Sequence, residues 1–184
     1  MRFKRLNLPE VVLFEPTVFK DARGFTLEAF NLKAFKEATS LNVKFVQSNL
    51  SKSSRNVIRG LHYQAYPKSQ GKLVQAIEGE IFDVAVDLRK SSKSFGKWVG
   101  AKLSEKNKNL LWIPEGFGHG FIVMSKYAII HYQLTNFYDP KKEKSILWND
   151  SEIGIRWPIK KNINPIVSKK DKIGKSLKNA KVYK

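Results

Sequence analysis

Histidines are the side chains of this chain best suited to moving protons, because an imidazole ionises near neutral pH. The chain has three of them. His62 lies in the run Arg-Gly-Leu-His-Tyr-Gln, and His119 ends the run Pro-Glu-Gly-Phe-Gly-His. Both runs have the glycines and aromatics typical of strand edges and tight turns, where a rigid scaffold presents functional side chains. His131 falls within a predicted strand. His62 and His119 are the candidates for chemistry, against the alternative that each is a hydrogen-bonded structural histidine.

Other residues of suitable type accompany His62. Arg59 and Lys72 can hold anionic groups, Tyr132 can act as an acid, and Asp171 can orient the imidazole. A histidine base held by a carboxylate, with a cation at a developing enolate oxygen, is the set that removes a proton beside a carbonyl. In a regular strand Arg59 and His62 would point to opposite faces, so Gly60 is interpreted as a bulge that re-aims one of them.

The motifs indicate a cupin-like barrel without a metal. Metal-binding cupins carry His-x-His in their first motif, whereas Gln64 stands at the second position here. The second motif, Pro-x-Gly-x-x-His, is retained and ends at His119. The chain has no cysteine, and the glycine-rich fingerprints of nicotinamide and ATP sites are absent. We therefore expect neither a metal nor any other cofactor.

Composition limits the classes of protein. A chain of 184 residues is expected to form one domain, spanning 1–184. No run is long enough to cross a bilayer and no signal peptide is apparent, so a cytoplasmic location is expected. The net charge of +18 raises the possibility of a nucleic-acid partner. Nine lysines and one acid lie in a lysine-rich C-terminal segment from about residue 160, which favours a solvated surface, so no nucleic-acid or membrane partner is expected.

Short alternating segments separated by Gly, Pro, Asn and Asp predict an antiparallel sandwich or barrel. One helix is expected over 32–38, capped by Asn31. The segment from Trp157 is expected to drape over the domain and to end in a flexible tail. Strands are expected near residues 11–14, 26–30, 44–50, 56–64, 73–78, 81–88, 98–103, 109–113, 119–123 and 128–136.

The predicted strand over 81–88 alternates in an informative way. Phe82, Val84 and Val86 share one face, and Asp83 and Asp87 share the other. If the acidic face looks into a barrel, these carboxylates can orient a catalytic group. If it looks at solvent, they are ordinary surface residues, and the pattern alone leaves both readings open.

Nearly the whole chain resembles the dTDP-4-dehydrorhamnose 3,5-epimerase family. The resemblance rests on runs spread along the sequence: Phe19-Lys-Asp-Ala-Arg-Gly-Phe-Thr-Leu-Glu28, Gln47-Ser-Asn49, Val57-Ile-Arg-Gly-Leu-His-Tyr-Gln64, Gly71-Lys-Leu-Val74, Gly79 to Arg89, Ser94 to Trp98, Pro114 to Phe121, Trp148-Asn-Asp150, Ile155 to Pro158 and Ser168-Lys-Lys-Asp171.

The resemblance implies an all-β, double-stranded β-helix (a cupin-type jelly roll) with short peripheral helices, acting as a homodimer on a sugar nucleotide. An N-terminal segment would cross to the neighbouring subunit. His62, paired with Asp171, would remove the protons at C3 and C5, Tyr132 would return them, and Lys72 would stabilise the enolate. The positions that match sugar-nucleotide ligands are Arg23, Glu28, Gln47, Asn49, Arg59, His119, Tyr138, Glu143 and Lys170, with Tyr138 stacking on the base.

The chain departs from the usual family pattern at Thr26 and Gln75. Relatives that epimerise C3 or C5 alone, or that isomerise other nucleotide-linked 4-keto sugars, share nearly all of these residues. The expected function is 3,5-epimerisation of dTDP-4-dehydro-6-deoxy-D-glucose to dTDP-4-dehydro-L-rhamnose. The alternatives are a mono-epimerase, a ketoisomerase of the same fold, and a binding module without catalysis.

Overall fold

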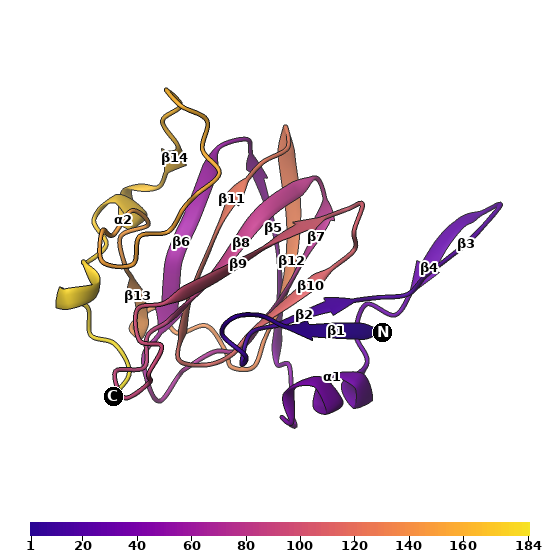
Figure 1. Cartoon of the computed structure of the whole chain (residues 1–184), viewed down its shortest axis with the longest axis horizontal. Helices are drawn as coiled ribbons and strands as arrows, with labels where there is room; N and C mark the ends of the chain where they lie inside the picture. The colour runs from indigo at the N-terminus through magenta and orange to yellow at the C-terminus, as the bar shows by residue number, and fades with distance from the viewer.

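Two facing β-sheets form a barrel in the computed structural model, which describes residues 1–184 (Figure 1). The first sheet contains, in spatial order, β1 (Arg2–Arg5), β2 (Val12–Glu15), β10 (Leu110–Ile113), β7 (Lys72–Glu78), β12 (Tyr127–Leu134) and β5 (Gln47–Ser54). The second contains β13 (Glu143–Ser145), β6 (Val57–Gln64), β11 (Phe117–Val123), β8 (Glu80–Asp87) and β9 (Trp98–Ser104), with β14 (Ile166–Val167) beside β6.

Strands that follow one another along the chain mostly lie in opposite sheets. β5 and β7 belong to the first sheet, and β6 and β8 belong to the second. Within each sheet the neighbours are antiparallel, except for the short parallel pair of β14 and β6. This is the topology of a jelly roll, and it confirms the predicted fold class.

The apolar core fills part of the barrel interior. Side chains at alternate positions of both sheets meet there, as expected when successive residues of a strand point to opposite faces. The cluster is built mainly from aliphatic residues and two phenylalanines: Leu8, Val11, Val74, Ala76, Ile81, Ala85, Val99, Leu103, Leu111, Ile113, Phe117, Phe121, Val123, Ala128 and Ile130. The rest of the interior is therefore left for polar side chains.

Helix α1 (Leu32–Thr39) covers the outer face of the first sheet. Asn31 caps it, because its side-chain oxygen accepts a hydrogen bond from the Ala34 amide. The helix buries Phe35, which packs edge-on against Trp112 with ring centroids 4.9 Å apart. The predicted helix and its cap are confirmed.

The C-terminal segment covers the outer face of the second sheet. It includes the short helix α2 (Lys169–Lys172) and the 3-10 helix η1 (Leu177–Asn179). Leu177 and Ala180 are buried against that sheet, and the Tyr183 hydroxyl donates a hydrogen bond to the Gln64 carbonyl. The predicted draping of this segment over the domain is confirmed, and apolar side chains between the lysines of the predicted tail pack on the barrel.

The hairpin of β3 (Val18–Asp21) and β4 (Gly24–Leu27) projects from the barrel body (Figure 1). The strand predicted over 26–30 overlaps only the end of β4, because the chain turns towards α1 after Leu27. The strand predicted over 44–50 begins only at Gln47. Neither α1 nor α2 has the length and apolar character needed to span a bilayer.

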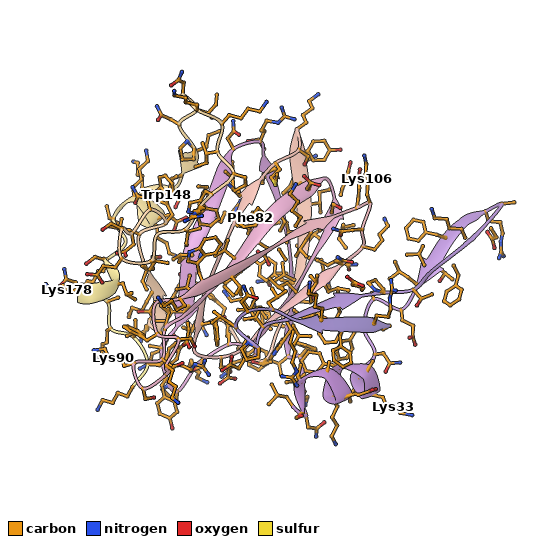
Figure 2. The ribbon with its side chains drawn as sticks, viewed as in Figure 1. Lys33, Phe82, Lys90, Lys106, Trp148 and Lys178 are labelled. Carbon is orange, nitrogen blue, oxygen red and sulfur yellow. The ribbon has the colours of Figure 1, made fainter.

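Positive charge is spread around the molecule. Figure 2 labels Lys33, Lys90, Lys106 and Lys178 at widely separated points on the periphery. Between them, Phe82 on β8 packs edge-on against Trp98 and Trp157, with ring centroids 6.4 Å and 6.5 Å away. These four lysines thus lie around the apolar packing on the outer face of the second sheet and do not form one patch.

Candidate active site

Polar side chains gather at one end of the barrel interior. In the first sheet, Asn49, Tyr132 and Val74 are directly paired across three strands, and Tyr132 and Val74 both reach the interior core. Paired residues point to the same face of a sheet, so Asn49 also looks inward. The next inward row of the same sheet holds Gln47 and Lys72. The barrel therefore changes from an apolar filling to a polar one along its length.

A bulge in β6 brings Arg59 and His62 to the same face. His119 of β11 pairs with His62, but Phe121, two residues later, pairs with Arg59, three residues earlier. The extra residue makes the bulge that the sequence predicted at Gly60. Gly60 has φ of +122°, and a Cβ atom there would lie 2.6 Å from the His119 carbonyl oxygen. Only glycine fits this position.

His62 and Asp171 lie 109 residues apart in the chain and are in contact. The Asp171 Oδ1 atom is 2.5 Å from His62 Nε2, and its Oδ2 atom accepts a long hydrogen bond of 3.4 Å from the Gly60 amide. α2 carries the carboxylate, and Ser168 caps that helix by accepting a hydrogen bond from the Asp171 amide. Figure 1 shows α2 beside β6.

The contact sets the ionisation of Asp171. Burial alone would raise the pKa of this carboxyl, but the hydrogen bond and charge of His62, with the Gly60 amide, lower it below the usual value. Asp171 is in contact with His62 Nε2, so Nδ1 is the ring nitrogen left for a ligand. The side chain of His62 is 26% exposed, so the ring is partly open to the surroundings.

Lys72 lies beside His62 at the start of β7. Its ammonium donates a hydrogen bond of 3.4 Å to the His62 carbonyl oxygen. Burial lowers the pKa of Lys72 to about 8, while the charges of Asp83 and Glu143 oppose part of that shift. A cation that is this weakly solvated interacts strongly with negative charge that develops next to it.

A second histidine–aspartate pair lies deeper in the barrel. The His119 Nε2 atom is 2.7 Å from Asp83 Oδ1, and Asp83 is fully buried. Burial lowers the pKa of His119, although Asp83 acts in the opposite direction. Of the two readings left open for the acidic face of β8, the inward one is therefore correct.

Asp87 on β8 is also buried, but it has a structural role. Hydrogen bonds from Arg89 and Ser94 hold its carboxylate. They lower the pKa of Asp87 to about 2 even though burial acts to raise it. The alternation along β8 thus places Asp83 in the site and Asp87 in a structural hydrogen-bond network.

The loop after β12 carries Tyr138 to the rim of the polar end. Tyr138 is half exposed, and its hydroxyl donates to the Glu143 carboxylate at 2.8 Å. Lys170 forms an ion pair with the same carboxylate. Burial would raise the pKa of Glu143, but Lys170 and Tyr138 lower it. These three predicted ligand positions therefore form one connected group.

The remaining predicted ligand positions of the barrel are also linked. Gln47 Nε2 donates to Asn49 Oδ1 at 3.0 Å, and the Gln47 side chain also accepts the Tyr138 amide. Arg59 Nε donates to the buried Ser53 hydroxyl at 2.9 Å, which fixes the guanidinium across the barrel. Tyr132 has no hydrogen bond to these groups and faces the interior from the sheet opposite His62.

Arg23 and Glu28 of the same chain do not contact the polar residues at the end of the barrel. Arg23 lies at the turn of the projecting hairpin and pairs with Asp21 at 2.5 Å, and Glu28 accepts a hydrogen bond from Asn31. Thr26 is exposed on the same hairpin, and Gln75 is buried and donates to the Lys108 carbonyl. The two departures from the family pattern thus lie outside the polar end of the barrel.

Sequence reasoning missed two members of the site. Asp83 was recognised only as a residue that can face inward, because its contact with His119 depends on the pairing of β8 and β11. Gln64 was noticed only as the residue that replaces a metal ligand, although its side chain holds the loop of Tyr138. The spacing His-x-Gln on one strand face was the available signal for Gln64.

A jelly-roll barrel that places a histidine–carboxylate pair, a partly desolvated lysine and a tyrosine in its interior belongs to the cupin-type enzymes, in the subclass that moves protons with side chains. Comparison with known proteins then identifies the family. Residues 5–179 match the family model described as dTDP-4-dehydrorhamnose 3,5-epimerase. The chain belongs to the dTDP-4-dehydrorhamnose 3,5-epimerase family.

Individual relatives agree along the whole chain. The dTDP-4-dehydrorhamnose 3,5-epimerase of Shigella flexneri is 52% identical over 183 residues, covering 100% of this chain and 99% of its own. The crystal structure of the enzyme from Elizabethkingia anophelis NUHP1 has a TM-score of 0.93 at 45% identity, covering 100% and 99% of the two chains. That of the Legionella pneumophila Philadelphia 1 epimerase, in complex with dTDP-4-keto-L-rhamnose, has a TM-score of 0.91 at 42% identity, covering 97% and 93%.

Proposed function

We propose that this protein epimerises C3 and C5 of dTDP-4-dehydro-6-deoxy-D-glucose, giving dTDP-4-dehydro-L-rhamnose. The observation that carries the proposal is the contact of 2.5 Å between His62 and Asp171 next to the ammonium of Lys72. The substrate has a ketone at C4, which acidifies the hydrogens on both neighbouring carbons. A base and a cation at this spacing suit the removal of such hydrogens.

The reaction begins when His62 Nδ1 takes the proton from C3. The electron pair of the broken bond moves to the C4 oxygen, where the charge of Lys72 stabilises the enolate. Asp171 stabilises the imidazolium that forms. A proton from the Tyr132 hydroxyl then arrives at C3 from the opposite face, which inverts the carbon. Solvent then takes the proton from the His62 imidazolium and returns one to the Tyr132 phenolate. The same sequence at C5 completes the epimerisation and consumes no cofactor.

The nucleotide is bound by the polar rim. Tyr138 stacks on the base, and the other side chains contact the rest of the sugar nucleotide: Gln47, Asn49, Arg59, His119, Glu143 and Lys170. The support for this assignment is their common location at the polar end of the barrel and the hydrogen bonds that join Gln47, Tyr138, Glu143 and Lys170.

We also propose that two copies of the chain form a homodimer. The hairpin exposes Phe19 and Phe25, which are 62% and 55% accessible, and the outer face of the first sheet exposes Leu50 and Ile77. Apolar surface of this kind marks an interface. The hairpin of one subunit crosses to the other and delivers Arg23 and Glu28 to its nucleotide.

Exchange of carbon-bound hydrogen tests the activity directly. The purified protein is incubated with dTDP-4-dehydro-6-deoxy-D-glucose in D2O, and incorporation at C3 and C5 is followed by proton NMR. Deuterium at both carbons is expected from the native chain, and none from His62→Ala. Deuterium at one carbon only identifies a mono-epimerase. If neither carbon exchanges, the proposed reaction is wrong. If the substrate nevertheless binds, the alternative of a binding module without catalysis is favoured.

Mixing two inactive variants tests the exchange of hairpins. Arg23→Ala and His62→Ala each damage a different half of a shared site, so a mixed dimer regains one intact site. Activity is expected to rise after the two proteins are mixed. The matched control mixes Lys72→Met with His62→Ala, whose changes fall in the same subunit's site, and no recovery is expected. Equal behaviour of both mixtures contradicts the crossing hairpin.

A further inference from the structure

The loop between β12 and β13 is held by glutamine side chains from three separate strands and loops. Gln47 accepts a hydrogen bond from the Tyr138 amide at 2.8 Å. Gln70 donates to the Asn136 carbonyl at 2.8 Å. Gln64 binds both sides of Tyr138, since it donates to the Phe137 carbonyl at 3.2 Å and accepts from the Asp139 amide at 2.7 Å. The backbone on both sides of Tyr138 is therefore held by hydrogen bonds from these three glutamines.

Gln64 is the central member of this group. It is 3% exposed, and its amide makes a third hydrogen bond, of 2.6 Å, to the Lys68 carbonyl. One buried side chain thus joins the loop after β6 to the loop after β12. Backbone groups that are held by a buried amide lose little further entropy when a ligand binds to them.

The position of Gln64 explains why a glutamine stands there. It faces the interior two residues after His62, where a metal-binding cupin has its second histidine. Here the side chain turns to the loop, and its amide offers both the donor and the acceptor that two neighbouring peptide groups require. A histidine or a carboxylate at this position cannot satisfy all three backbone partners.

We propose that Gln64 is a positioning residue, which sets the affinity for the nucleotide by holding Tyr138 in its stacking position before the ligand arrives. The inference deepens the proposed function and rests on it. Gln64 acts through the loop and does not touch the reacting carbons. Its loss therefore weakens binding and leaves the proton transfers of His62 intact.

Substitution by alanine tests the division between binding and catalysis. In Gln64→Ala, KM for the sugar nucleotide and Kd for dTDP, measured by titration calorimetry, are expected to rise about tenfold, or about 1.4 kcal/mol. The value of kcat should stay within about threefold of the native one, since no group that moves a proton changes. Gln64→Met, which keeps most of the volume, is the second variant if alanine destabilises the fold.

Asn107 supplies a matched control. Its amide also makes three hydrogen bonds to the backbone, to Lys102, Ser104 and Asn109, at distances of 2.9 Å and twice 3.0 Å. It lies in the turn between β9 and β10, next to Lys106 at the edge of the molecule (Figure 2). The Asn107 side chain is exposed whereas Gln64 is buried, so Asn107→Ala is expected to lower the melting temperature less, and it should leave Kd for dTDP unchanged.

A double-mutant cycle shows whether Gln64 acts through Tyr138. If it does, Gln64→Met has little further effect on Kd in a Tyr138→Ala background. Additive losses would show that Gln64 acts elsewhere and would overturn the proposal. A fall in kcat at unchanged KM would also overturn the proposal, because that result is expected from the loss of a catalytic group such as His62 and not from the loss of a positioning residue.

Amide hydrogen exchange tests the positioning without any substrate. The amides of residues 137–139 are expected to lose protection in Gln64→Met and to keep it in Asn107→Ala. Unchanged protection in the first variant contradicts the proposal even if the native enzyme is active. Conversely, if the native chain exchanges no hydrogen at C3 or C5, the proposed function fails, while the measured protection and the Kd for dTDP still decide the role of Gln64.

Discussion

Two histidine–aspartate pairs lie side by side in one barrel, and they differ in where the carboxylate comes from. His62 and His119 are partners across β6 and β11. Both present Nε2 to an aspartate, at 2.5 Å and 2.7 Å. Asp83 comes from the neighbouring strand of the same sheet, whereas Asp171 comes from a helix outside the barrel. The outer pair is also more accessible, with side-chain exposures of 26% for His62 and 9% for His119.

The same pair of side-chain types therefore serves two purposes in this barrel. A histidine that burial keeps neutral, and that is locked to Asp83 within a sheet, is a fixed hydrogen-bonding group. A partly exposed histidine at a bulge, with only Nε2 bound to a carboxylate, suits the proton exchange proposed for His62. The fixed pair also places the charge of Asp83 close to Lys72, and so tunes the cation that the outer pair uses.

Removal of either imidazole is expected to have the strongest effect on the kinetics. His62→Ala is expected to lower kcat by about 10³-fold, because the general base is lost. His119→Ala should act mainly on KM, since the role proposed for His119 is to bind the sugar nucleotide and not to move a proton. Steady-state kinetics and solvent-deuterium exchange measure both. Equal losses of kcat in the two variants would contradict the assignment of His62 as the base.

The orienting carboxylate has the next largest effect. Asp171→Asn replaces the acceptor for His62 Nε2 with an amide that has no charge, so the imidazolium loses its stabilisation. We expect kcat to fall by about 10²-fold. Folding should be retained, because Ser168 accepts its hydrogen bond from the backbone of residue 171 and not from its side chain. Circular dichroism provides the control.

Lys72 gives a pH dependence. Its pKa of about 8 predicts that kcat falls as pH rises through that value, because the neutral amine no longer stabilises the enolate. Lys72→Arg should remove this alkaline limb, since a guanidinium stays charged. A profile measured from pH 6 to pH 10 tests this, and an unchanged limb in the arginine variant would assign the ionisation to another group.

The same ionisation acts on stability in the opposite sense. Folding lowers the pKa of Lys72 from 10.5 to about 8, so the buried charge destabilises the fold below pH 8. Lys72→Met is therefore expected to raise the melting temperature at pH 7. The gain should shrink as pH rises from about 8 to about 10.5, where the native lysine is neutral when folded. A constant gain would show that packing and not charge is responsible.

Asp83→Asn is expected to change turnover less than the other substitutions. The asparagine still offers an oxygen to His119, so kcat near neutral pH should fall by less than about tenfold. The lost negative charge no longer raises the pKa of Lys72, so the alkaline limb should move to lower pH. If the alkaline limb of the pH profile does not move, the charge of Asp83 does not control the ionisation of Lys72.

Local pattern and motif were sufficient to predict most of this architecture. Alternation placed the main strands, the Asn31 cap placed α1, and the glycine between Arg59 and His62 indicated the bulge. Short elements such as β1, β13 and α2 were missed because their positions depend on neighbours distant in sequence. The contact of His62 with Asp171 was proposed from residue types and family likeness, since nothing local links residues 109 positions apart.

The separation of His62 from Asp171 has a consequence for how the protein is made. Synthesis on the ribosome completes β6, and later every strand of the barrel, before α2 emerges. During that interval the imidazole exists without its carboxylate. A nascent chain therefore lacks the carboxylate that orients its imidazole, and we expect full activity only after α2 has docked on β6.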